Sequence, residues 1–222
     1  AHSRDGLAAL LWPDAPEEAA KKNLRDVLSN LRRLVEPYLD ITRQTAALRT
    51  DAVIQVDSLN FAANIKAAQA ETATEQRNAR LREATLLYRG EFLQGFHVAE
   101  AAPFEEWVLS EREHYRQLAL QALHLLTVNA EQRKAYLEGI DYATRLLALE
   151  PWAEETHRQL MRLLAASGQR SAALAHYETC RRVLASELGA APDVETEALV
   201  AQIRQGDLRF TSYDLRNDDA PP

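Results

Sequence analysis

A spacing of 34 residues recurs in the second half of the chain, and it constrains the fold more than any other feature. Four pairs of residues repeat at this interval, namely Gly139 with Ala173, Ile140 with Leu174, Ala143 with Tyr177 and Leu146 with Cys180. A repeat of this length is one small unit that cannot bury its apolar face alone, so neighbouring units have to stack. We therefore expect the small residue, Gly139 or Ala173, where two helices of one repeat press together.

Thirty-four residues is the period of the tetratricopeptide repeat, which is a pair of antiparallel helices. This period predicts one helix pair at 117–130 and 133–149, a second pair at 153–167 and 169–187, and a last helix near 194–204. The sequence beyond Gly206 has little periodicity, so residues 206–222 are predicted to be a tail or a linker.

The composition favours helices throughout. The chain has 222 residues, of which 46% are hydrophobic and only seven are glycine, and most of the eight prolines fall between periodic segments. Further helices are predicted at 58–70, at 74–88 and from Phe104 to about Val128. Residues 89–96 hold two glycines and two phenylalanines, a density that predicts an ordered turn.

An amphipathic helix is predicted from Asp14 to Pro37. Asp14 and Glu17 have the spacing of a capping box, and Pro37 prevents continuation. At 100° per residue the apolar residues gather on one arc, which contains Ala20, Leu24, Val27, Leu28, Leu31, Leu34 and Val35. The opposite arc contains Lys22, Arg25, Ser29, Arg32 and Arg33. Helices in a DNA major groove have this pattern, but so do many solvated surface helices.

The segments on either side of this helix add information. Residues 3–12 are predicted to form a short helix whose apolar residues, Leu7, Leu10, Leu11 and Trp12, point inward. After Pro37 the stretches D-I-T-R-Q, A-L-R-T-D and A-V-I-Q-V-D alternate apolar and polar residues, which predicts short strands and one hairpin. Two helices followed by a hairpin form the second half of a winged helix-turn-helix.

Charge and cysteine content narrow the functional classes. The net charge of −7 argues against a general nucleic-acid coat, although residues 19–50 hold seven basic and three acidic side chains. The single cysteine rules out an internal disulfide, and we identify no membrane-spanning run and no signal peptide. A soluble cytoplasmic protein is expected.

No catalytic, metal or cofactor site is expected. The histidines lack zinc-binding spacing, the chain has no glycine-rich phosphate loop, and Cys180 falls at a repeat position that should be buried. Aromatic residues at helical spacing are usually part of a core. We assign that role to Tyr88, Phe92, Phe96, Trp107 and Trp152. An enzyme is therefore not predicted.

Several ordered motifs resemble the bacterial transcriptional activator domain of SARP-type regulators. They are L-Y-R-G-E-F-L-Q-G-F (87–96), F-E-E-W-V-L-S-E-R (104–112), P-W-A-E-E-T-H-R-Q-L-M-R-L-L (151–164), A-A-L-A-H-Y-E (172–178) and E-L-G-A-A-P (187–192). Residues 4–61 similarly resemble the end of an OmpR-type winged helix. The resemblance implies a mostly α-helical transcription regulator, with a partial winged helix-turn-helix and short β-hairpin at 1–56 and a tetratricopeptide-like repeat domain at 57–205.

The resemblance also implies partners and site residues. The winged helix would bind direct repeats in double-stranded promoter DNA, and the repeats would mediate homodimerisation and contact RNA polymerase or another domain of the same regulator. In this interpretation Lys22, Arg25 and Ser29 read bases, because long cations and a serine hydroxyl suit base edges. The cations expected at phosphates are Lys21, Arg32, Arg33 and Arg43.

Two alternatives stay open from the sequence. The residues Arg158, Gln159, Arg162 and Arg181 form either a groove for an acidic peptide or ordinary exposed helix charge. The chain itself is either a DNA-binding regulator or an interaction module that does not bind DNA. The resemblance implies upstream strands and a first helix that the given sequence does not contain before Ser3, so Leu7, Leu11 and Leu28 are expected to be open unless another chain covers them. The hairpin at 42–49 also lacks the Gly-Tyr pair common in OmpR-type wings.

Overall fold

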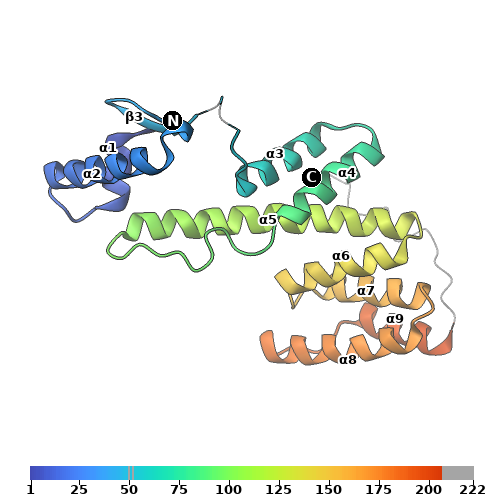
Figure 1. The fold of residues 1–222 in the computed structure, drawn as a ribbon. Coiled ribbons are helices and arrows are strands. Elements are labelled where there is room, and N and C mark those ends of the chain that lie inside the picture. Colours follow the sequence, from blue (N-terminus) through green and yellow to red (C-terminus); the bar gives the residue numbers. More distant parts are fainter. Residues whose placement is uncertain (50, 52, 207–222) are drawn as a thin grey trace, which may run out of the picture. The chain divides into compact units, whose positions relative to one another are not determined.

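The computed structural model describes residues 1–49, 51 and 53–206, and the chain divides into two compact units at Ala119 (Figure 1). The helix α5 (Ala102–Gln132) contributes its first part to one unit and its remainder to the other. The first unit also contains β1 (His2–Ser3), α1 (Arg4–Leu11), α2 (Glu17–Val35), η1 (Glu36–Tyr38), β2 (Leu39–Ile41), β3 (Thr45–Leu48), α3 (Asp57–Ala70) and α4 (Thr74–Leu87). The second contains α6 (Tyr136–Leu149), α7 (Glu154–Ala166), α8 (Arg170–Glu187) and α9 (Val194–Gln205). The predicted mostly α-helical fold is confirmed.

The first part of the chain forms the predicted two helices and hairpin. α1 and α2 pack around a small core made of Ala8, Ala20, Leu24 and Leu28. The sheet has the order β1-β3-β2 and is antiparallel throughout, with Leu39 opposite Leu48 and Ser3 opposite Thr45. The strand β1 was not predicted. A strand was predicted within residues 52–57, but residues 53–56 form none, and residue 52 lies outside the described residues.

The predicted capping box at the start of α2 is wrong. The helix begins at Glu17, three residues after Asp14, and the cap position is held by Pro16, which makes no side-chain cap. Its carbonyl instead accepts the first helical hydrogen bonds, from the amides of Ala19 and Ala20. The helix predicted at 58–70 begins one residue earlier, because α3 starts at Asp57.

The apolar face of α2 is only partly covered. Ala20, Leu24 and Leu28 are buried, but the exposed fractions are 40% for Val27, 39% for Leu31 and 78% for Leu34. The expectation that Leu28 lies open is therefore wrong. Leu7 and Leu11 are half-buried, and Leu11 packs against a cluster formed by Ala101, Phe104 and Val108.

The turn at 89–96 is ordered, as predicted, and α5 holds it. Leu93 and Gly95 have the positive φ angles of 49° and 77° that reverse the chain, and glycine adopts such angles at little cost. The Arg112 guanidinium donates to the carbonyls of Phe92 (2.9 Å) and Leu93 (3.0 Å). Phe92 also meets Trp107 edge to face, at a centroid distance of 5.7 Å. Phe96, Trp107 and Trp152 nevertheless stay 40% exposed or more, so the predicted core role is only partial for them.

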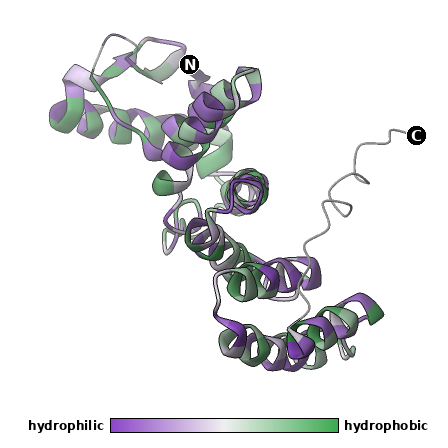
Figure 2. Cartoon of the chain, turned by 90° about the vertical axis from the view of Figure 1, so that its right-hand side faces the viewer, coloured by the Kyte–Doolittle hydropathy of each residue, from purple (hydrophilic) through white to green (hydrophobic). Residues whose placement is uncertain are grey.

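The second unit is a stack of helices in which α6, α7, α8 and α9 pack in succession. Hydrophobic and hydrophilic residues alternate along these helices (Figure 2). A Cβ at Gly139 would be 3.4 Å from the Ala130 Cβ within the predicted repeat, but 2.9 Å from a Leu163 methyl, so the tightest approach is to α7 of the next repeat. The second 34-residue position, Ala173, is fully buried, as is Cys180. One difference is that α5 runs unbroken through the start predicted for a helix at 117.

Candidate nucleic-acid interface

The three predicted base readers lie on the exposed face of α2. Their positions follow from the helical period, since the buried residues Ala20, Leu24 and Leu28 fix which face points inward. Within the described part of the chain, the side chains of Lys22, Arg25 and Ser29 make no hydrogen bond and no ion pair. Their polar groups are therefore free to bind a ligand in this structure.

Two of the four predicted phosphate residues are similarly accessible. Arg33 is exposed near the end of α2 and donates to the Asn30 side-chain oxygen. Arg43 is exposed at the turn between β2 and β3. The Thr42 hydroxyl closes this turn by accepting from the amides of Gln44 (3.2 Å) and Thr45 (3.0 Å). Arg43 is thus a cation at the tip of a closed hairpin.

The other two predicted phosphate residues already have partners. Lys21 donates to Glu17 and lies 3.7 Å from Asp5. The hydrogen bond to Glu17 raises the pKa of Lys21, and the charge of Asp5 raises it further. The Arg32 guanidinium donates to the Ile41 carbonyl over 2.9 Å. Lys21 is therefore largely neutralised, and Arg32 ties the end of α2 to β2.

The predicted partner-binding residues do not behave as one set. Arg158 is paired with Glu155, Glu195 and Asp193, and its distance to the Asp193 carboxylate is 2.6 Å. Arg162 pairs with Glu131 at 3.2 Å. Gln159 is buried and donates to Glu131. Arg181 is exposed on α8 and pairs with Glu178. The α7 residues thus join neighbouring helices of the second unit.

A histidine pair in the second unit was not predicted. The Nδ1 atom of His157, on α7, lies 2.8 Å from Nε2 of His176, on α8. Burial lowers the pKa of both imidazoles, that of His176 to about 4. Nearby, burial raises the pKa of the Cys180 thiol to about 12. The two histidines are 19 positions apart on different helices, so no local spacing in the sequence points to them.

The described residues contain neither a metal-binding cluster nor a membrane-spanning helix. Residues 1–49, 51 and 53–206 contain no group of three or more His, Cys, Asp and Glu side chains arranged to hold a metal. Over the same residues, no helix combines the length and the apolar character needed to cross a membrane.

Comparison with known proteins relates this arrangement to bacterial regulators. The regulatory protein AfsR of Streptomyces coelicolor is 29% identical over 205 residues, which cover 90% of this chain and 20% of that protein. AfsR of Streptomyces griseus is 27% identical over 222 residues, covering 97% of this chain and 21% of that protein. The chain thus spans about a fifth of the length of these curated relatives.

A solved structure shares the fold. Mycobacterium tuberculosis EmbR, in complex with a low-affinity phosphopeptide, superposes with a TM-score of 0.57 at 23% identity, covering 92% of this chain and 55% of that one. At this identity the likeness supports the fold alone.

A family model decides the assignment. The model described as the bacterial transcriptional activator domain matches residues 56–204, well over half of the chain. These residues include all five motifs that carried the sequence resemblance, which is thereby confirmed. The chain belongs to the bacterial transcriptional activator domain family, the family of the SARP-type transcription regulators.

Proposed function

We propose that the chain is part of a bacterial transcription regulator that binds promoter DNA through α2 and the β2–β3 hairpin. The observation that carries the proposal is the exposed face of α2, where Lys22, Arg25 and Ser29 have no partner among the described residues. The major groove admits an α-helix, and a long cation can bond both acceptors of a guanine edge. The proposal keeps the predicted division into a winged-helix part at 1–56 and a repeat domain at 57–205. Apart from Gly206, the predicted tail at 206–222 lies outside the described residues.

The accessible cations divide between two tasks in this proposal. Lys22 and Arg25, with Ser29, contact base edges, where a good bidentate pair contributes about 1–3 kcal/mol of discrimination. Arg33 and Arg43 contact phosphates, which set the register of the protein on the duplex without reading sequence. For Lys21 and Arg32 a phosphate contact stays a prediction, and each already bonds an intramolecular partner.

The test is duplex binding across a range of salt concentrations. Replacing Lys22 and Arg25 with alanine is expected to weaken binding to a selected site more than binding to unrelated duplex DNA. Replacing Arg43 is expected to weaken both equally and to lower the slope of log K against log salt by about one unit. Lys66→Ala is the matched control, because Lys66 is an exposed cation on α3, outside the proposed interface. If the Lys22 and Arg25 variants lose the same affinity for the selected site as for unrelated duplex DNA, base reading by these residues is refuted.

We also propose that the helical repeats contact RNA polymerase or another domain of the same regulator. Family membership supports this proposal, and a pull-down with purified RNA polymerase tests it. The homodimer implied by the sequence resemblance stays a prediction, for which sedimentation of the purified chain is the test.

A second candidate function is an interaction module that does not bind DNA. The exposed side chains of Val27, Leu31 and Leu34 on α2 favour it, since contiguous apolar surface often marks a protein interface. Leu34→Asp separates the two functions. The variant should keep duplex binding if α2 reads DNA, and it should lose a protein partner if the apolar face docks one.

A further inference from the structure

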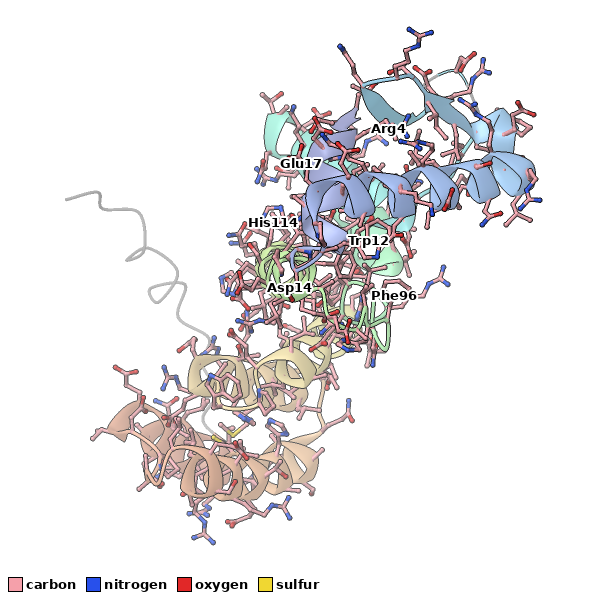
Figure 3. The ribbon with its side chains drawn as sticks, turned by 90° about the vertical axis from the view of Figure 1, so that its left-hand side faces the viewer. Arg4, Trp12, Asp14, Glu17, Phe96 and His114 are labelled. Carbon is pink, nitrogen blue, oxygen red and sulfur yellow. The ribbon has the colours of Figure 1, made fainter. Side chains whose placement is uncertain are left out.

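Two arginines from different helices bond successive carbonyls of the β2–β3 hairpin. Arg32, in the last turn of α2, donates from Nη2 to the Ile41 carbonyl over 2.9 Å. Arg4, the first residue of α1, donates from Nη1 to the Thr42 carbonyl over 3.3 Å. Arg4 is labelled in Figure 3, where it lies at the sheet. The two guanidiniums thus approach the hairpin from α2 and from α1, immediately before Arg43.

The backbone reinforces this attachment on one side. The amide of Arg4 donates to the Gln44 carbonyl over 2.8 Å and continues the pairing of β1 with β3. The strands β2 and β3 are three and four residues long, and an isolated hairpin of that size is marginally stable in water. The position of the hairpin relative to α2 therefore depends on contacts from outside it.

We propose that Arg4 and Arg32 are positioning residues that fix the hairpin tip, and with it Arg43, relative to the reading helix α2. We call these two residues the hairpin clamp. A helix in the groove and a cation on a flanking phosphate must engage the same duplex together, so a fixed separation between them removes an ordering cost from binding. The inference rests on the proposed DNA-binding function and adds to it that Arg32 acts through Arg43 rather than on a phosphate.

The first arm of the test uses the free protein. Arg4→Met and Arg32→Met keep much of the apolar stem and remove every donor. Each is expected to speed amide exchange in residues 42–45 about tenfold, since local opening becomes easier. Arg33→Met is the matched control, because Arg33 is a neighbouring cation that bonds only Asn30, and it should leave the hairpin unchanged. Arg32→Lys keeps a positively charged donor group and is expected to retain most of the protection. Unchanged exchange in both clamp variants would overturn the proposal.

The second arm is a double-mutant cycle on duplex binding. If Arg32 acts through Arg43, the pair Arg32→Met and Arg43→Ala should bind no more weakly than Arg43→Ala alone, with the same salt slope. For Arg33→Met combined with Arg43→Ala, the losses of binding free energy should instead be additive. Additive losses for Arg32, with a further drop of about one unit in the slope, would make Arg32 a phosphate ligand and overturn its positioning role.

These experiments distinguish a failure of the proposed DNA-binding function from a failure of the hairpin clamp. If the unaltered chain does not bind duplex DNA at any salt concentration, the proposed function fails, and the role of the clamp in binding fails with it. If the chain binds DNA but the cycle for Arg32 is additive, the proposed function stands and the clamp alone is refuted.

Discussion

The pair of His157 and His176 predicts how the stability of the second unit depends on pH, and the structure gives the size of this dependence. Nε2 of His157 lies 2.8 Å from the Pro151 carbonyl, which can only accept, so this nitrogen carries the proton. Nδ1 of His157 is then an acceptor, and it receives the Nε2 proton of His176 over 2.8 Å. Both rings are neutral in this arrangement. Protonation of His157 would place two donors face to face.

The sign of the pH dependence follows from the lowered pKa values. Burial, and after it the charge that His157 carries when protonated, lower the pKa of His176 from 6.5 to about 4. Burial also lowers the pKa of His157, against opposing effects of the Pro151 carbonyl and Glu154. Below pH 6.5 the unfolded chain binds protons that the folded chain does not, so stability is full above this pH and is lost toward pH 4. One unit of pKa corresponds to about 1.4 kcal/mol, so His176 alone should remove about 2 kcal/mol between pH 6.5 and pH 5.

The assay compares His176→Gln with the unaltered chain. Glutamine can still donate to Nδ1 of His157 but cannot be protonated. We expect the protection factors of amides in α7 and α8, which correct the exchange rates for the intrinsic rate at each pH, to fall less in the variant than in the unaltered chain between pH 7 and pH 5. His124→Gln, which replaces an exposed histidine of α5, is the control. An equal fall of the protection factors in the His176 variant and in the unaltered chain would refute the reasoning.

Three further predictions concern packing and reactivity. Gly139→Val should lower the free energy of unfolding in urea by about 1–3 kcal/mol, because its added carbons meet the Leu163 methyls, and a neutral result would show that the helices can separate there. Asn78→Leu should raise the same free energy by about 1 kcal/mol, since neither polar atom of the buried Asn78 side chain has a hydrogen-bond partner among the described residues. A lower free energy of unfolding in this variant would indicate that a bound water satisfies the polar atoms of Asn78. Cys180, with a pKa of about 12 and no exposed surface, should resist alkylation at pH 8 until urea unfolds the second unit, and rapid labelling of the folded chain would contradict its burial.

Periodic patterns predicted most of the helices, because a buried stripe has to repeat along each of them. The 34-residue spacing also indicated a close helix approach at Gly139, although the tightest contact is with Leu163 of the next repeat and not within the repeat of Gly139. The positions at which helices begin and end were harder to predict. The capping-box spacing at Asp14 and Glu17 is short and frequent, and the turn through Pro13 and Pro16 moved the start of α2 beyond it.

Contacts between distant residues could not be predicted from local patterns. The two-residue strand β1 pairs with β3 more than 40 positions away, and the clamp joins Arg4 to Thr42 over 38 positions. An amphipathic pattern identifies an apolar face but not whether another segment covers it. The exposed Leu31 and Leu34 on α2 therefore became visible only in the structure.

Selection from a random pool of DNA duplexes tests the central claim that α2 reads sequence. The unaltered chain, the variant with alanine at Lys22 and Arg25, and the Lys66→Ala control would each be taken through the selection at the same salt concentration. We expect the unaltered chain and the control to enrich one shared motif, and the α2 variant to retain DNA without enriching it. Enrichment of the same motif by all three proteins, or no retention of duplex DNA by the unaltered chain, would contradict the claim.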